Sequence, residues 1–217
     1  MIYIFSDTHI SRPGCNNVEL LAMLKGLNSD DRIIISGDFL DLHYMQLLDI
    51  FAEYEDLIIE FLKHLFVYVI GNHDYELTKI KDASFFGGKA YYPEVITTID
   101  GKKWLITHGH YFGWYGFIFR ILERFYDVPA FRKISKWVAK NEILSFMARN
   151  KVRIGAGVRE DALARAKELG CEVVICGHNN LPEIVESNGI TYVNPGSCLG
   201  SIKFVTYDKG NFRLIGV

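Results

Sequence analysis

Short hydrophobic runs recur along the chain, and each is followed by polar residues or glycine. A run of four or five hydrophobic residues is too short for most helices of globular proteins and predicts a buried β-strand. We expect five of these strands, at Ile2–Phe5, Ile33–Ser36, Phe66–Ile70, Trp104–Thr107 and Val173–Cys176.

Segments with helical periodicity lie between several of these runs. Val18–Leu27 and Met45–Leu65 predict helices, and the second carries acidic residues on its polar side. Alternation of strands and helices predicts an α/β sheet. The tail, Glu183–Val217, predicts short strands joined by turns at Asn188-Gly189 and Lys209-Gly210.

The pattern changes over residues 114–170. Hydrophobic residues from Trp114 to Phe125 recur at offsets 0, 3, 4, 7, 8 and 11, which is one face of a helix. A second stripe follows Pro129, and further helices are expected over Asn141–Met147 and Val158–Leu169. We therefore predict a helical cap, inserted over residues 114–170 into a single domain that spans residues 1–217.

Composition limits the classes of protein to consider. A chain of 217 residues with 49% hydrophobic content suits one domain with a sizeable core. Its net charge of −2 gives no overall attraction to nucleic acid. The chain begins with a strand-like run rather than a signal peptide, and its four cysteines form no CxxC pair, so we expect a cytoplasmic protein with reduced thiols.

Charge is unevenly distributed. Residues 114–153 carry nine basic and three acidic side chains, a net charge of +6, which leaves −8 for the remainder. One interpretation is the solvated face of a structural helical hairpin. The other is a lid that recognises an anionic, partly apolar substrate. Candidate substrate-binding residues in this lid are Arg120, Arg124, Arg132 and Lys133.

Five polar clusters follow directly after the five hydrophobic runs. Because the carboxyl ends of strands in an open α/β sheet share one crevice, these clusters are expected to converge. Asp, His and Asn together suit Mn²⁺, Fe or Zn²⁺ better than an all-oxygen Ca²⁺ site. The clusters are Asp7-Thr8-His9, Gly37-Asp38-Phe39-Leu40-Asp41, Gly71-Asn72-His73-Asp74, His108-Gly109-His110 and Gly177-His178.

In this order the clusters resemble the signature of the calcineurin-like metallophosphoesterase superfamily, DxH, GDxxD, GNHD, a lone His and GHxH. The resemblance spans residues 2 to 180. It implies an α/β fold in which a β-sandwich is flanked by helices in four layers. It also implies two divalent cations, Mn²⁺ above all, with Fe, Zn²⁺, Ni²⁺ or Co²⁺ as alternatives. The implied reaction is hydrolysis of a phosphate ester or pyrophosphate bond by a metal-bridging hydroxide.

The resemblance also implies roles for individual residues. Asp38 would bridge two metals, and His73 would act on the phosphate, oriented by Asp41, which otherwise caps a helix. His110 is expected either to support the site or to make a structural hydrogen bond. The metal ligands would be Asp7 and His9 at the first site, and Asn72, His108 and His178 at the second.

Asn180 departs from the signature, which places a histidine ligand of the first metal there. The Ser/Thr protein phosphatase branch also lacks this histidine, and water fills the coordination. We expect the same here, with or without the Asn180 amide oxygen, and hence weaker binding of the first metal than of the second.

The substrate remains open among several classes. A helical insertion between these motifs resembles that of UDP-diacylglucosamine pyrophosphatases, which act on a lipid-linked nucleotide at the membrane surface. The sequence VNPGS at 193–197 is similar to a turn of bacterial phosphodiesterases. A small phosphodiester and a phosphoprotein are alternatives, as are a nuclease and a non-catalytic scaffold. A basic amphipathic cap would allow peripheral membrane contact.

Overall fold

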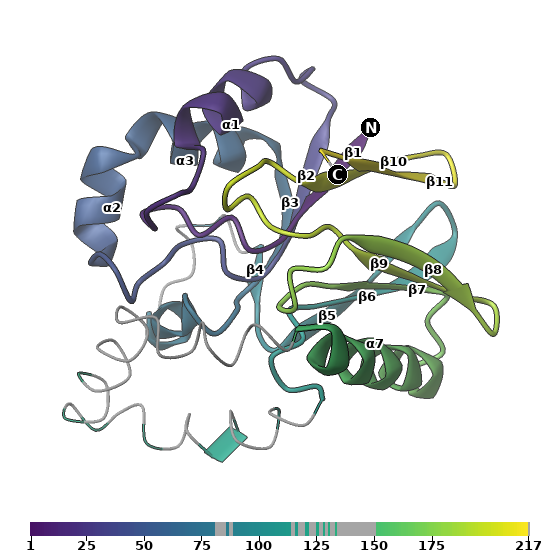
Figure 1. Ribbon diagram of the computed structural model, residues 1–217. Coiled ribbons are helices and arrows are strands. Elements are labelled where there is room, and N and C mark those ends of the chain that lie inside the picture. Colours follow the sequence, from purple (N-terminus) through teal and green to yellow (C-terminus); the bar gives the residue numbers. More distant parts are fainter. Residues whose placement is uncertain are drawn as a thin grey trace.

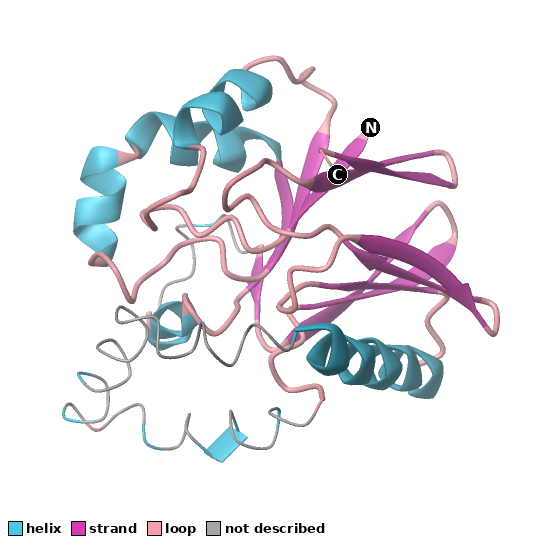
Figure 2. Ribbon diagram, viewed as in Figure 1, coloured by secondary structure: helices cyan, strands magenta, loops and turns pink. Residues whose placement is uncertain are grey.

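The computed structural model describes residues 1–80, 86, 89–113, 116, 120, 121, 125, 128, 130, 133 and 151–216, and for residues 151–156 the backbone only. Two β-sheets lie face to face in it, with helices on their outer sides (Figure 1). Figure 2 shows the same arrangement by type of element. The layers run helices, sheet, sheet, helix, as the family resemblance implies.

The first sheet has the strand order β11-β10-β1-β2-β3-β4. Its strands β1 to β4 are parallel, whereas β10 pairs antiparallel with both β1 and β11. The strands are β1 Ile2–Phe5, β2 Arg32–Ser36, β3 Leu65–Val69, β4 Ala90–Tyr91, β10 Phe204–Asp208 and β11 Asn211–Ile215.

The second sheet has the order β5-β6-β7-β9-β8. Its central strands β6, β7 and β9 are parallel, and the outer strands pair antiparallel with them. The strands are β5 Glu94–Ile99, β6 Lys102–Thr107, β7 Val173–Cys176, β8 Glu183–Ser187 and β9 Ile190–Asn194.

Side chains along each central strand point alternately to the two faces of the sheet, and both faces are buried. The predicted runs are therefore almost entirely hydrophobic. Ile4 packs between the sheets, with Ile34 and Trp104, whereas its neighbour Phe5 packs beneath the helices. A strand buried on both faces needs apolar residues at every position. All five predicted strands are present, each with bounds within two residues of the prediction.

Three helices cover the outer face of the first sheet (Figure 1), and their buried residues join those of its strands in one hydrophobic cluster. They are α1 Asn17–Leu24, α2 Leu47–Glu53 and α3 Glu55–His64, and a 3₁₀ helix, η1, spans Tyr75–Lys79. The prediction of one helix over Met45–Leu65 was wrong. Tyr54, with φ −117° and ψ 26°, divides it into two, and neither glycine nor proline marks the break.

Helix α7 (Lys151–Glu168) covers the outer face of the second sheet. Its buried Val158, Ala162 and Ala166 pack with residues of β6, β7 and β9. The last part of the segment predicted as a cap is therefore one of the domain's own layers. Most of residues 114–150, including the two expected hydrophobic stripes and the helix over Asn141–Met147, lies outside the described residues.

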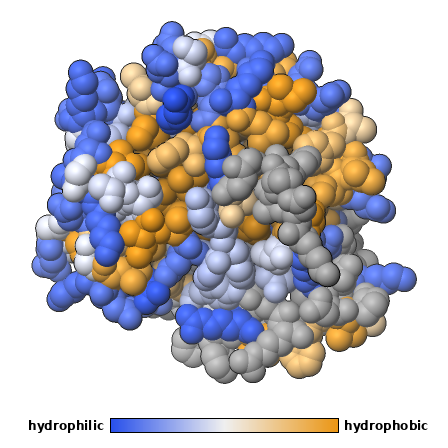
Figure 3. All heavy atoms as spheres, turned by 180° about the vertical axis from the view of Figure 1, so that it is seen from behind, coloured by the Kyte–Doolittle hydropathy of each residue, from blue (hydrophilic) through white to orange (hydrophobic). Residues whose placement is uncertain are grey.

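Strand β5 has no counterpart in the prediction. It pairs with β6 through a tight turn at Asp100-Gly101, where both residues have positive φ. The two predicted turns of the tail, Asn188-Gly189 and Lys209-Gly210, have the same geometry and are confirmed. The face seen from behind mixes hydrophobic and hydrophilic side chains (Figure 3). Within the described ranges, no helix is both long and apolar enough to cross a membrane.

Candidate metal centre

The five polar clusters converge, and they do so between two sheets rather than at the edge of one. Three follow β1, β2 and β3 of the first sheet, and two follow β6 and β7 of the second. Hydrogen bonds from backbone amides hold the loops together. The His9 amide donates to the Asp38 carbonyl at 2.9 Å, and the His178 amide donates to the side-chain oxygen Asp7 Oδ2 at 3.0 Å. The expectation of a crevice in a single open sheet was therefore incomplete.

Asp7, His9 and Asp38 form one group of candidate metal ligands. All three are buried, and one ligand atom from each lies within 4.8 Å of the others. His9 Nε2 is 3.8 Å from Asp7 Oδ1 and 3.8 Å from Asp38 Oδ2, beyond hydrogen-bond distance of either. Two carboxylates and an imidazole that surround a shared centre at this spacing fit a divalent cation.

His108 anchors a second group. Its Nδ1 lies 3.0 Å from the Ser36 carbonyl, which can only accept, so Nδ1 carries the hydrogen. Its Nε2 then faces Asn72 Oδ1 at 3.1 Å and Asp38 Oδ2 at 3.3 Å. A bare imidazole nitrogen aimed at two acceptor oxygens requires a proton or a metal cation among them. The His178 ring lies beside this group, with its centroid 5.1 Å from that of His108.

Charges of the second group follow from these contacts. Burial alone would lower the pKa of His108, but the Asp38 carboxylate outweighs it and raises that pKa to about 10. Burial raises the pKa of Asp38, yet His108 and His73 outweigh it and hold the pKa well below its usual range. Burial lowers the pKa of His178, and His108 lowers it further. His178 is therefore neutral at pH 7, the form in which an imidazole binds metal.

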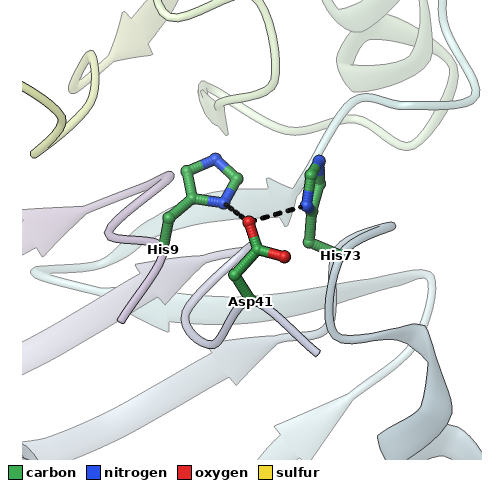
Figure 4. A group of neighbouring side chains, drawn as sticks. All are labelled: His9, Asp41 and His73. Carbon is green, nitrogen blue, oxygen red and sulfur yellow. Dashed lines mark hydrogen bonds and ion pairs between the residues drawn. The ribbon is translucent and has the colours of Figure 1, made fainter. Parts of the chain in front are cut away.

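Asp41 lies between two histidines (Figure 4). Its Oδ2 is hydrogen-bonded to His73 Nδ1 at 3.0 Å and lies 3.3 Å from His9 Nδ1, so the same oxygen is next to both rings. Burial lowers the pKa of His73, but the Asp38 and Asp41 carboxylates outweigh it and raise that pKa to about 9. His73 is also more exposed than Asp41 and His9, with 17% of its side chain accessible. It can therefore present a proton to a molecule bound from solvent.

The backbone at the centre has positive φ at residues that supply its side chains. Asn, Asp and His adopt positive φ more often than other L-residues do, so these residue types suit the tight loops that follow the strands. Five of the candidate ligands adopt positive φ: Asp7, His9, Asp38, His178 and Asn180.

Glycines that precede the candidate ligands make room for them. A Cβ on Gly37 would overlap the His108 ring, one on Gly71 would overlap Asp38, and one on Gly177 would overlap Ser6. Close packing therefore requires glycine in the GD, GN and GH pairs. The sequence alone shows only that these pairs recur.

Asp74 connects two of the loops. Its Oδ2 accepts from the Phe39 amide at 2.7 Å and from the Tyr68 hydroxyl, and its Oδ1 accepts from the Gly71 amide at 2.6 Å. Asp74 is fully buried and thus fixes the Asp38 and Asn72 loops relative to each other.

The remaining candidates differ in how the structure places them. The His110 ring centroid lies 5.4 Å from that of His108, beside the centre. Asn180 Oδ1 is buried without a hydrogen-bond partner among the described residues. The Arg120 guanidinium lies over the Tyr111 ring, and Lys133 is exposed. Arg124 and Arg132 lie outside the described residues.

Sequence comparison agrees with this geometry. Residues 1–207 match the calcineurin-like phosphoesterase superfamily domain. The chain belongs to this superfamily. The resemblance inferred from the five motifs is thereby confirmed, and the buried Asp and His clusters are those of a metallophosphoesterase superfamily member.

Solved structures share the fold. An archaeal phosphodiesterase is 20% identical, with a TM-score of 0.52, and the match covers 100% of this chain and 99% of that one. Vps29 from Chaetomium thermophilum is 12% identical, with a TM-score of 0.54 and coverage of 100% and 96%. Vps29 from Entamoeba histolytica, complexed with Zn²⁺, is 15% identical, with a TM-score of 0.51 and coverage of 100% and 97%. At these identities the likeness concerns the fold alone.

Proposed function

We propose that this metallophosphoesterase superfamily member is an active hydrolase that depends on two divalent cations and cleaves a phosphate ester or pyrophosphate bond. The observation that carries the proposal is the His73–Asp41 pair, joined at 3.0 Å beside the buried Asp7, His9 and Asp38 group. A metal-binding scaffold would need the group of metal ligands but not the His73–Asp41 pair.

Each part of the centre has a distinct task in this reaction. Asp7, His9 and Asp38 would hold one cation, and Asp38, Asn72, His108 and His178 the other. When bound, such a pair supplies Lewis acidity toward phosphoryl oxygens and lowers the pKa of water. His73 Nε2 lies 4.0 Å from Asp38 Oδ2, so the proton it carries points into the centre. We assign His73 to protonation of the leaving oxygen, with Asp41 fixing its tautomer.

Mn²⁺ is the metal we favour, because mixed carboxylate, imidazole and amide ligands suit it. Fe, Zn²⁺, Ni²⁺ and Co²⁺ are alternatives, and the Zn²⁺ complex of a Vps29 with this fold supports metal binding as such. We expect the first site to bind more weakly than the second, since Asn180 supplies at most an amide oxygen. A calorimetric titration that resolves two equally tight sites would contradict this.

The substrate classes we favour are a small phosphodiester and a lipid-linked nucleotide, hydrolysed in the cytoplasm, with peripheral membrane contact in the second case. The archaeal phosphodiesterase of the same fold supports the first. Support for the second comes from the charge of +6 over residues 114–153. Protein phosphatase and nuclease activities are less favoured, the nuclease because of the overall charge of −2.

Mn²⁺-dependent hydrolysis by the purified protein tests the proposal. The substrates are bis-p-nitrophenyl phosphate, p-nitrophenyl phosphate and a UDP-linked lipid. His73→Ala should lose at least about a hundredfold in kcat, the usual contribution of a general acid, while it still binds Mn²⁺ in calorimetry. A metal-loaded protein that is inert toward every ester would instead indicate a scaffold. Preference for the lipid nucleotide over both small esters would identify the substrate class.

A further inference from the structure

Arg12 reaches the His73–Asp41 pair from a different loop. It follows the first motif by three residues, in a turn where its amide donates to the His9 carbonyl at 2.9 Å. The preceding residue, Ser11, has φ 86°, and its hydroxyl donates to the Asp41 carbonyl at 3.0 Å. A strained and hydrogen-bonded backbone therefore fixes the position from which the Arg12 side chain extends.

The guanidinium forms an ion pair with Asp41 but donates no hydrogen bond to it. Its terminal nitrogen NH1 is 3.8 Å from Asp41 Oδ2, beyond hydrogen-bond distance, and its carbon Cζ lies 5.6 Å from the centroid of the Tyr44 ring. Among the residues that the structure describes, it makes no hydrogen bond. Since 29% of the Arg12 side chain is accessible, a molecule from solvent can reach its five N–H donors.

Asp41 is already used by other groups. Its Oδ2 faces both His73 and His9, and its Oδ1 accepts from the His43 amide at 3.2 Å. Arg12 is therefore not needed to satisfy that carboxylate. The planar guanidinium and the His73 ring both lie next to Asp41 Oδ2. A permanently charged guanidinium matches the geometry of a phosphate group, which it binds through paired hydrogen bonds.

We propose that Arg12 binds a non-bridging oxygen of the substrate's phosphate and thereby determines affinity for anionic phosphates at this centre. This rests on the proposed function, and it makes Arg12 a specificity residue beyond the superfamily's motifs. A phosphomonoester or terminal phosphate approaches two negative charges near neutral pH, whereas a diester carries one, so the monoester depends more strongly on Arg12.

Two measurements on the Mn²⁺-loaded full-length protein test this, with Arg12→Gln, Arg12→Lys and, as a matched control, Arg213→Gln on the exposed face of the edge strand β11. The first is calorimetric binding of inorganic phosphate. The second is the separation of KM from kcat for p-nitrophenyl phosphate and for bis-p-nitrophenyl phosphate.

For Arg12→Gln we expect phosphate binding to weaken, and KM for the monoester to rise, by about tenfold or more, as loss of a charge-assisted hydrogen bond predicts. KM for the diester should rise less, and kcat should change by less than about threefold. Arg12→Lys, which keeps the charge, should recover part of the loss, and Arg213→Gln should match the wild type.

Unchanged phosphate affinity in Arg12→Gln, or a fall in kcat alone, would overturn the proposal and leave Arg12 to act only through Asp41. Failure of the wild type to bind phosphate would overturn it too. Because phosphate binding is measured without turnover, a protein that hydrolyses no ester but loses phosphate affinity in Arg12→Gln would disprove the proposed function and support the role of Arg12. Equal melting temperatures of the variants exclude unfolding as the cause.

Discussion

At the scale of single residues, the centre is defined by carboxylates that each contact more than one histidine. Asp41 Oδ2 contacts both His9, a candidate ligand, and His73, the candidate acid. Asp38 likewise accepts from the His73 amide at 2.9 Å and faces His108. One carboxylate therefore couples metal binding to proton donation, and a change at either should affect both.

Asp41→Asn tests this coupling. The amide cannot hold both rings as a carboxylate does, so we expect kcat at saturating Mn²⁺ to fall by about ten- to a hundredfold, and Mn²⁺ affinity to fall by a similar factor. Steady-state kinetics and calorimetry measure the two effects. Asp49→Asn, on the exposed side of α2, is the control. A variant with lower kcat and unaltered Mn²⁺ affinity would show that Asp41 does not support His9.

Gly71→Ala tests whether the motif glycines are needed for packing. The new Cβ would overlap Asp38, and we expect a loss of about 1–3 kcal/mol in the free energy of unfolding, together with weaker Mn²⁺ binding. Gly157→Ala in α7 is the matched control, since its nearest neighbour would lie 3.5 Å away and alanine favours helix. Chemical denaturation measures both variants, and equal stability would contradict the packing argument.

At the scale of elements, the hydrophobic pattern predicted the central strands but neither strand β5 nor the break between α2 and α3. The five central strands follow from short hydrophobic runs, because strands buried on both faces leave that signal. Strand β5 was missed because it is an edge strand without a continuous buried run, with Ile96 and Thr98 exposed, and it pairs only with β6. The break at Tyr54 was missed because tertiary packing, rather than glycine or proline, divides the helix.

Candidate ligands were also predictable from the sequence, since each follows a run with recognisable spacing. Arg12 was not, because a single arginine beyond a motif has no spacing signal. Only the Ser11 turn and the position of Tyr44 reveal it. The pairing of Asp38 and Asp41 with particular histidines was not predictable either, because it depends on loops that are distant in sequence.

Asp74→Asn tests how the loops after β2 and β3 are fixed. The carboxylate accepts from two amides and a hydroxyl, and an amide group would place its own donor against one of them. Leaving a buried donor unsatisfied costs about 1–3 kcal/mol, which we expect as loss of stability in urea denaturation. Asp56→Asn, exposed on α3, should change little. Mn²⁺ affinity should fall as well, and a stable variant with normal affinity would refute the role of Asp74.

At the scale of the whole molecule, the centre lies where two sheets meet. Asp7, His9 and Asp38 follow strands of the first sheet, and His108 and His178 follow strands of the second. The hydrophobic cluster between the sheets, which includes Ile4, Ile34 and Trp104, joins them along the strands. A bound cation would join them at the strand ends, where the buried groups are polar.

Metal binding should therefore stabilise the entire domain. We expect each site to add about 2.7 kcal/mol to the free energy of unfolding when Mn²⁺ is at a hundred times the Kd of that site, and a chelator to remove it, because the cation binds only the folded arrangement. Calorimetric melting with and without Mn²⁺ measures the shift. His178→Ala removes a ligand from the second sheet and should reduce the shift, whereas Lys209→Ala in an exposed turn should not. A chelator that left the melting temperature unchanged would show that the two sheets hold together without help from a cation.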